Sequence, residues 1–200
     1  MKTDTWIPCA QVDAHSTRAA AALAELYPAL HFIVQISEPS SQALKAKDPS
    51  SRITVQKRTR GALQTVKDAA VYILGPRSPG PGAPSNSLRL RILAQLRAHF
   101  GVLRTNTSAT LILAPRLLPE PGTVDPDVEA IARLRDLSLL QLANEREMEM
   151  GELLEIVNSL HDGMGRLVVV NKLLSRNSAT VALSVKYQAH ADGPLEHSQQ

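Results

Sequence analysis

The stretch AQVDAHSTRAAAALAELYPALHFIVQI, residues Ala10–Ile36, decides the fold. Its pattern predicts an apolar strand, a turn, an alanine-rich helix over Thr17–Tyr27 with Ser16 as its N-cap, and a second strand over Leu30–Ile36. Strand, helix and strand within about 30 residues form the βαβ unit of a parallel α/β sheet. In such a unit the first turn and the end of the second strand face the ligand.

The rest of the chain continues this alternation. Apolar runs predict strands at Arg52–Lys57, Ala69–Leu74 and Thr110–Ala114, and helical spacing predicts helices at Ser40–Ala46, from Leu88, over Val128–Asn144 and over Glu147–Leu160. A loop rich in proline and glycine separates two of these elements at Gly75–Ser87. Two final segments, Arg166–Leu174 and Ala179–Tyr187, predict an antiparallel hairpin. We therefore expect an α/β fold with five parallel strands and an antiparallel C-terminal hairpin, one domain over residues 1–190, and a disordered tail over 191–200.

Composition limits the classes of function. The chain has 200 residues, a net charge of +3, 3% aromatic residues and one cysteine, Cys9. Few aromatic residues argue against a stacking platform for nucleic acid, and a solvated loop explains the densest basic cluster, Lys57, Arg58 and Arg60. One cysteine, which we expect in the core, excludes a multi-cysteine metal site. No apolar run of about 18 residues suggests a membrane span, so we predict a cytoplasmic protein with no nucleic acid or membrane partner and no metal.

Four further segments carry a family resemblance, and they occur in the family's order: LAELYPALHFIVQI, SSRITV with AAVYIL, ATLILAPRLLPEPG, and RDLSLLQLANEREMEMGELLEIV. From about Cys9 to Tyr187 the chain resembles the catalytic domain of the S-adenosylmethionine-dependent O-methyltransferases of the plant caffeate type and their fungal secondary-metabolism relatives. The resemblance implies a Rossmann-like methyltransferase sheet and S-adenosylmethionine as cofactor.

The positions that the resemblance assigns to this cofactor hold other residue types. In place of the family's glycine-rich turn the chain has Gln11, Asp13, Ala14, His15 and Thr17. Ile36 stands where the family has the acidic residue that binds the ribose, and Thr59 stands near the family's adenine contact. Glycine lets a backbone approach a ligand closely, and an aliphatic side chain accepts no hydrogen bond. We therefore expect no cofactor to be bound.

The catalytic positions also differ from the family pattern. The family's general base is a histidine that should follow AAVYIL, and the segment GPRSPGPGAP there contains none. One supporting acidic position falls on Pro115, while the other remains as Glu145, for which we expect a salt bridge to a nearby arginine. His15 is a speculative base, although a structural role is the simpler interpretation. His161 and Asp162 resemble the lost motif, but we expect a surface turn there.

One apolar stripe and the start of the chain bear on partners. Ile131, Leu134, Leu137 and Leu140 follow helical spacing, which predicts core packing or else an exposed patch for a partner. Family members carry an N-terminal dimerisation domain, which we expect this chain to lack.

Three hypotheses follow. The first is a pseudo-methyltransferase that binds a small-molecule metabolite or a protein partner supplying the missing domain. The second is a repurposed, cofactor-independent cyclase. The third is an active O-methyltransferase with a rebuilt cofactor turn.

Overall fold

The computed structural model describes residues 7–14, 16–36, 52–59, 61–76 and 87–190. Within these ranges the elements are, in chain order, β1 (Ile7–Val12), α1 (Arg18–Leu26), β2 (Leu30–Ile36), β3 (Ile53–Lys57), β4 (Val71–Leu74), α2 (Ser87–Thr105), β5 (Thr110–Leu113), α3 (Pro126–Ala143), α4 (Met150–Asn158), β6 (Gly165–Ser175) and β7 (Ser178–Ala189). The predicted helix at Ser40–Ala46, most of the Gly75–Ser87 loop and the predicted tail lie outside the described residues.

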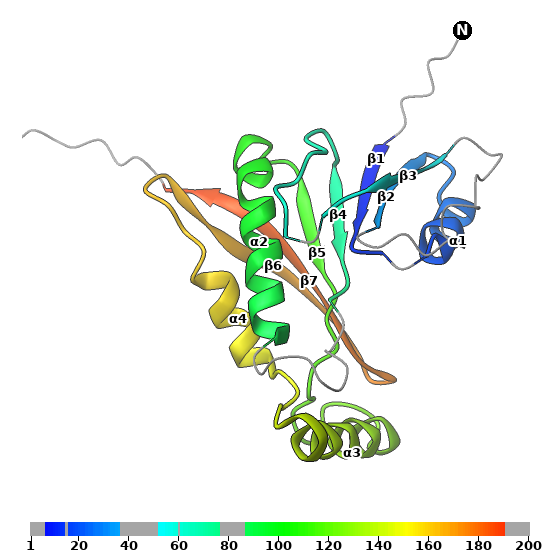
Figure 1. The fold of residues 1–200 in the computed structure, drawn as a ribbon, viewed down its shortest axis with the longest axis vertical. Coiled ribbons are helices and arrows are strands. Elements are labelled where there is room, and N and C mark those ends of the chain that lie inside the picture. Colours follow the sequence, from blue (N-terminus) through cyan, green and yellow to red (C-terminus); the bar gives the residue numbers. More distant parts are fainter. Residues whose placement is uncertain (1–6, 15, 37–51, 60, 77–86, 191–200) are drawn as a thin grey trace, which may run out of the picture.

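All the strands join one sheet in the order β3-β2-β1-β4-β5-β7-β6 (Figure 1). The first five are parallel, and β7 pairs antiparallel with both β5 and β6. This confirms the predicted α/β sheet with its C-terminal hairpin. Because the strand order reverses between β1 and β4, the carboxyl ends of these two strands form the place where doubly wound sheets bind their ligands.

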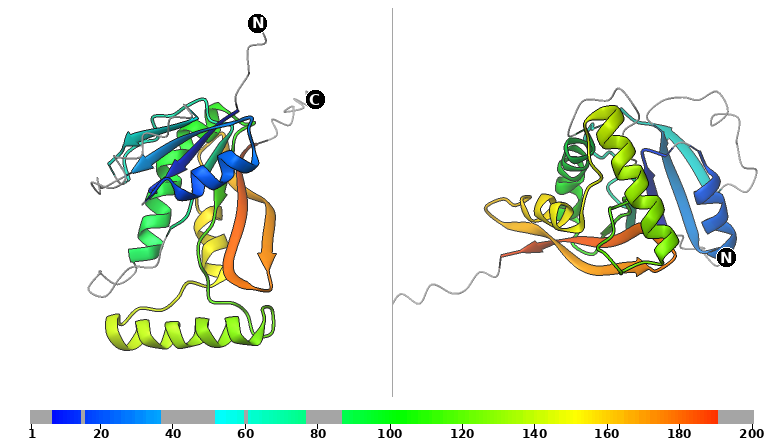
Figure 2. Two further views of the ribbon diagram at one scale, coloured as in Figure 1. Left: turned by 90° about the vertical axis from the view of Figure 1, so that its right-hand side faces the viewer. Right: turned by 90° about the horizontal axis from the view of Figure 1, so that it is seen from below.

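The core has two parts. The larger packs α2 and α4 on the sheet around β4, β5 and β7, and fully buried Leu96, Leu111 and Leu183 belong to it. The smaller packs α1 against β1 and β2 with Cys9 and Phe32, which confirms Cys9 as a core residue (Figures 1 and 2). Nearly all of this packing is aliphatic, as the scarcity of aromatic residues requires.

Two predicted helix starts were wrong. The residue that caps α1 is Thr17 instead of Ser16, and its side chain makes no capping hydrogen bond. The last long helix starts at Met150 instead of Glu147, because the preceding residues are extended and the Leu118 amide donates to the Met148 carbonyl at 2.9 Å.

The stripe on α3 is exposed, so the expectation of core packing was wrong. Ile131, Leu134, Leu137 and Leu140 are 68%, 65%, 50% and 43% exposed. The helix lies across the end of the sheet, apart from α2 and α4, and of the helix's residues Ala132 is buried (Figures 1 and 2). Helical periodicity revealed an apolar face on α3, but tertiary structure leaves that face uncovered in the described part of the chain.

Candidate functional site

Asp13 marks the point where the chain leaves β1. Its φ of 53° lies in the left-handed region, which a non-glycine residue adopts at some cost and which aspartate tolerates better than most. Its Oδ2 accepts a hydrogen bond from Nε2 of Gln95 on α2. The turn that would face a cofactor is therefore fastened to the neighbouring helix by a side chain.

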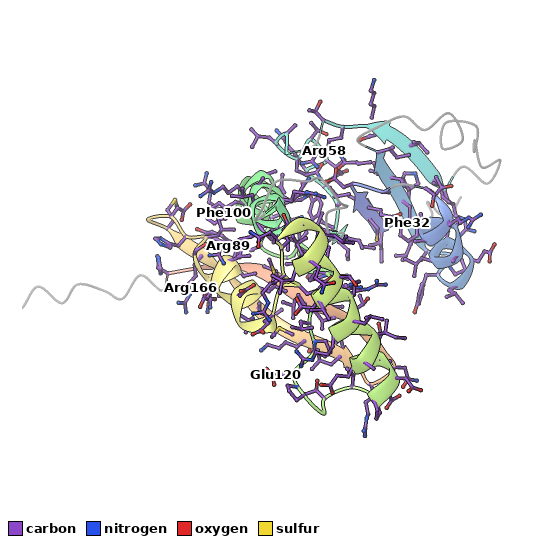
Figure 3. All side chains as sticks on the ribbon, turned by 60° about the horizontal axis from the view of Figure 1, so that its bottom comes forward. Phe32, Arg58, Arg89, Phe100, Glu120 and Arg166 are labelled. Atoms are coloured by element: carbon purple, nitrogen blue, oxygen red, sulfur yellow. The ribbon has the colours of Figure 1, made fainter. Side chains whose placement is uncertain are left out.

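Arg58 directly follows β3 and is only 6% exposed. Its guanidinium donates to Oε1 of Gln95 at 3.2 Å and to the carbonyl oxygen of Ala62, and it lies between the strands and α2 (Figure 3). Burial lowers the pKa of Arg58, whereas the charge of Asp13 raises it. The expectation of a solvated basic cluster was therefore wrong for Arg58, while Lys57 is exposed and Arg60 lies outside the described residues.

Hydrogen-bonded glutamine side chains extend from Arg58 into the protein interior. Gln35 on β2 and Gln64 exchange two side-chain hydrogen bonds of 2.8 and 2.9 Å. Nε2 of Gln64 also lies 3.0 Å from Nε2 of His99, whose Nδ1 lies 2.6 Å from the Gln95 carbonyl oxygen. Gln35, Gln64, Gln95 and His99 are all at least 95% buried. Together with Asp13 and Arg58 they form what we call the cleft network.

The tautomer of His99 follows from its partners. A carbonyl oxygen can only accept, so Nδ1 carries the proton and donates to Gln95, and Nε2 accepts from the Gln64 amide. Burial lowers the pKa of His99 to about 4, with a smaller contribution from the charge of Arg58 and against the opposing effect of the hydrogen bond to the Gln95 carbonyl. His99 is therefore neutral at neutral pH.

The structure places some of the residues predicted from the sequence at the carboxyl edge of the sheet, beside the cleft network. Ala14 is buried and its amide donates to the Gln35 carbonyl at 2.9 Å, and Ile36 is 5% exposed. The Oε1 atom of Gln11 is buried and has no hydrogen-bond partner among the described residues. Thr59 is exposed, and His15 lies outside the described residues.

The described residues at this edge do not fit S-adenosylmethionine. Ile36 at the end of β2 has no hydrogen-bond acceptor to offer a ribose, and Ala14 carries a Cβ at a position to which the resemblance assigns glycine. The cleft network pairs most of its polar groups with one another, although Oδ1 of Asp13 and Nε of Arg58 are buried without a hydrogen-bond partner among the described residues.

Glu145 lies in the segment between α3 and α4. It is 8% exposed, and its Oε1 has no hydrogen-bond partner among the described residues. Its predicted salt bridge to an arginine was wrong, because Glu147 takes that role with Arg135 Nε at 2.6 Å. A cavity of about 440 Å³ lies here, lined by residues that include Glu145 and Arg89.

The turn at His161 and Asp162 holds the start of the C-terminal hairpin. His161 is exposed, as predicted for a surface turn. Asp162 accepts hydrogen bonds from the Gly165 amide at 2.8 Å, the Tyr187 hydroxyl at 3.0 Å and the Arg104 guanidinium at 2.9 Å. Although burial raises the pKa of Asp162, hydrogen bonds from these groups and from the Met164 amide lower it to about 2. The carboxylate therefore acts structurally in this turn.

Two other kinds of site are absent from the part of the chain that the structure describes. No described helix has the length and hydropathy needed to cross a membrane. No group of three or more histidine, cysteine, aspartate or glutamate side chains in the described ranges is placed to hold a metal ion.

Solved structures with this architecture are methyltransferases and a related enzyme. The chain superposes on a structure described as a pericyclic reaction enzyme with a TM-score of 0.67 and 17% identity, over 94% of this chain and 45% of that one. For the methyltransferase CalO6 the TM-score is 0.64 with 16% identity, over 90% and 56%. For the mitomycin 7-O-methyltransferase MmcR it is 0.63 with 13% identity, over 94% and 51%. The chain has a methyltransferase fold.

Sequence comparison points to a different group of proteins. The chain is 53% identical to a transcriptional coactivator of Pseudocercospora fijiensis, over 90% of this chain and 51% of that protein. It is 41% identical to the monodictyphenone cluster transcriptional coactivator of Emericella nidulans (92% and 48%) and 46% identical to the agnestins biosynthesis cluster transcriptional coactivator of Paecilomyces divaricatus (91% and 43%). The chain thus spans about half the length of the curated relatives it matches. No protein-family model matches it.

Sequence reasoning identified the edge of the sheet but missed most of the residues that fill it. Arg58, Gln64, Gln95 and His99 were not predicted as site residues. Two signals in the sequence could have found them. Gln35 stands inside an otherwise apolar strand, and Gln95 and His99 are four residues apart on a helix whose other residues at helical spacing are apolar.

Proposed function

We propose that this chain is a non-catalytic methyltransferase-fold module that acts, through a protein partner, in the transcriptional control of a fungal secondary-metabolite gene cluster. Two kinds of observation support the proposal. The relatives named above are transcriptional coactivators, two of them of named biosynthetic clusters. The cleft network supplies the second.

The observation that carries the proposal is the pairing of Asp13 and Arg58 through Gln95. In a working enzyme of this fold, polar groups at the carboxyl edge of the sheet are kept available for the cofactor. Here those at the ends of β1 and β3 meet on one glutamine of α2. Binding a cofactor there would break these buried hydrogen bonds, each at a cost of about 1–3 kcal/mol for a group left unpaired.

Calorimetric titration with S-adenosylmethionine and S-adenosylhomocysteine tests the absence of cofactor chemistry. We expect no heat of binding at ligand concentrations of about 1 mM. Micromolar binding, about −8 kcal/mol, would contradict the proposal and favour the active methyltransferase. A mitomycin-type or other O-methyltransferase titrated in parallel serves as the positive control.

A regulatory role is tested in the native host. Deletion of the gene should lower the transcript levels of the neighbouring biosynthetic genes, and reintroduction should restore them.

The exposed Thr59 provides a matched variant, because Thr59→Arg blocks the position near the family's adenine contact without disturbing packing. Equal rescue by wild type and Thr59→Arg is expected. Loss of rescue by a folded Thr59→Arg protein would argue for a cofactor requirement.

A role in transcription also bears on location. Under this proposal the chain works in the nucleus, whereas composition alone predicted the cytoplasm. Fluorescent tagging distinguishes the two, and a signal confined to the cytoplasm while the cluster is transcribed would count against direct coactivation.

A second candidate function is metabolite binding at the cavity beside Glu145. The cavity has about 440 Å³ and charged walls that include Arg89 and Glu152, so it suits a polar ligand better than an apolar one. A cyclase that uses this cavity would convert a pathway intermediate in the absence of S-adenosylmethionine. Incubation of the purified protein with extracts from the deletion strain, followed by mass spectrometry, tests for such a conversion.

A further inference from the structure

The outward face of α3 is exposed and carries little charge. Leu134 lies at its centre, with Ile131 and Leu137 three residues to either side, and all three are at least half exposed. Residues three, four and seven apart share one face of a helix. Between Asp127 and the end of α3, no charged residue falls on the face that Leu134 occupies.

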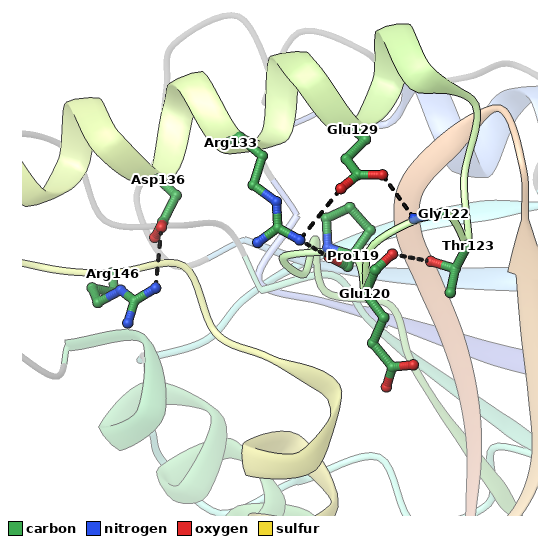
Figure 4. Close-up of polar contacts among 8 residues, drawn as sticks. All are labelled: Pro119, Glu120, Gly122, Thr123, Glu129, Arg133, Asp136 and Arg146. Carbon is green, nitrogen blue, oxygen red and sulfur yellow. Dashed lines mark hydrogen bonds and ion pairs between the residues drawn. The ribbon is translucent and has the colours of Figure 1, made fainter.

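Three other charged side chains of α3, those of Glu129, Arg133 and Asp136, point toward the body of the protein (Figure 4). Glu129 accepts from the Gly122 amide at 2.9 Å, and Arg133 donates to the Pro119 carbonyl at 2.8 Å. Asp136 accepts from the Glu147 amide at 2.8 Å. These contacts fix the rotation of α3 about its own axis, so its apolar face is directed outward by the structure.

This face is symmetrical about Leu134 in chemical type. Three residues away stand Ile131 and Leu137, both apolar, and four residues away stand Ala130 and Ser138, both small. Seven residues away stand Asp127 and Gln141, an acceptor and a donor, and eight residues away stand Pro126 and Leu142, both exposed. A two-fold axis through Leu134 therefore brings together residues that suit each other at every step.

We infer that the outward face of α3 binds the same face of a second copy of this chain, with the two helices antiparallel and Leu134 on the two-fold axis. Self-complementarity of one surface patch is what a two-fold interface requires. Small residues at the flanking positions let the helices approach to the 8–10 Å spacing typical of packed helices. Asp127 of one copy then meets Gln141 of the other. The axis also relates Arg133 to Arg135 of the second copy, and these arginines lie at the edges of the face and bind the Pro119 carbonyl and the Glu147 carboxylate of their own chain.

The arrangement of the fold permits this contact. α3 lies at one end of the molecule, and no other described helix or strand lies beyond its outward face (Figures 1 and 2). An 18-residue helix is about 27 Å long, so a single helix pair buries less than the roughly 800 Å² per partner of a standard interface. We therefore expect a dimer that dissociates in the micromolar range.

Sedimentation of the purified chain from about 1 to 200 µM tests the inference. We expect a monomer–dimer equilibrium that Leu134→Glu weakens about a hundredfold or more, because two carboxylates would meet on the axis. The matched control is Leu90→Glu, the same change at an exposed leucine of α2, which should leave self-association unchanged. A monomer at every concentration, or a dimer that Leu134→Glu leaves intact, overturns the inference.

Cross-linking with a short bis-maleimide tests the orientation and does not depend on the folding of Leu134→Glu. Cys9 is 2% exposed and does not compete. Leu134→Cys should cross-link with itself, and a mixture of Ile131→Cys and Leu137→Cys should cross-link several-fold more than either variant alone. Equal yields from the mixture and from the single variants overturn the antiparallel arrangement. A monomeric chain whose α3 face is covered only in a complex with another protein or on lipid vesicles overturns the second copy as its occupant.

Discussion

Protonation of His99 should loosen the cleft network and lower the stability of the whole fold. The neutral ring accepts a hydrogen bond from the Gln64 amide through Nε2 and donates to the Gln95 carbonyl through Nδ1. A proton on Nε2 turns that nitrogen into a donor that faces another donor, and it adds a positive charge near Arg58. Gln64 cannot simply rotate its amide, because its Oε1 already accepts from the Val66 amide at 3.0 Å.

The size of the effect follows from the pKa. Burial is the largest cause that lowers the pKa of His99 from an ordinary 6.5 to about 4, and the charge of Arg58 acts in the same direction. Because the folded-state value is the lower one, the neutral ring contributes its full stability above pH 6.5, and this contribution is lost as the pH falls toward 4. At about 1.4 kcal/mol per pKa unit, the loss between pH 7.5 and 4.5 is about 2.5 kcal/mol.

Urea unfolding followed by circular dichroism at pH 7.5, 6.0 and 4.5 measures this loss. His99→Gln is the informative variant, since its side-chain amide keeps an acceptor for Gln64 and does not titrate. Wild type should lose about 2.5 kcal/mol more than His99→Gln between pH 7.5 and 4.5, and exposed His161→Gln should behave as wild type. Equal losses in wild type and His99→Gln would refute the argument.

Three further outcomes are expected. Leu153→Ala, at a fully buried residue of α4, should lower the free energy of unfolding by about 2–5 kcal/mol. Leu134→Ala, at an exposed residue of α3, should change it by less than about 0.5 kcal/mol. If urea unfolding gave similar losses for both variants, α3 would be part of the core. Gly165→Ala should cost more than about 2 kcal/mol by the same measurement, because its Cβ would collide with the backbone carbonyl of Gln188, and a neutral effect would contradict this close approach. Since the pKa of Asp162 is lowered to about 2, its carboxylate contributes stability above about pH 4 that is lost toward pH 2. The midpoint temperature of thermal unfolding should therefore fall less steeply below pH 4 for Asp162→Asn than for wild type. Parallel curves of midpoint against pH would exclude this role.

Local patterns predicted the fold well because each strand and helix signals its own periodicity. The apolar run of Leu30–Ile36 can only be buried on both faces of a sheet, and the predicted strand bounds match the structure. The hairpin was equally readable, since β6 and β7 follow each other with a short turn. The stripe of α3 was misjudged for a physical reason: periodicity reports that one face is apolar, but it does not report whether another element covers that face.

The site could be predicted only in part because its contacts are long-range. Gln35 and Gln64 are 29 residues apart, and Arg58 and Gln95 are 37 apart. Such pairs meet only through the strand order of the sheet and the placement of α2. A family comparison draws attention to the positions that have changed, such as Ala14, but it does not reveal which other residues fill the space.

Under the proposed function, the cleft network is what allows a methyltransferase fold to persist without methyl transfer. The carboxyl edge of a doubly wound sheet carries polar groups that must be satisfied by a ligand, by water or by the protein itself. In this chain Gln95 pairs with both Asp13 and Arg58, and Gln64 pairs with both Gln35 and His99. Under the proposed function, these contacts hold the carboxyl edge together without a cofactor. An exposed apolar helix face such as that of α3 is the kind of surface through which a non-catalytic module of the proposed kind would build its interactions.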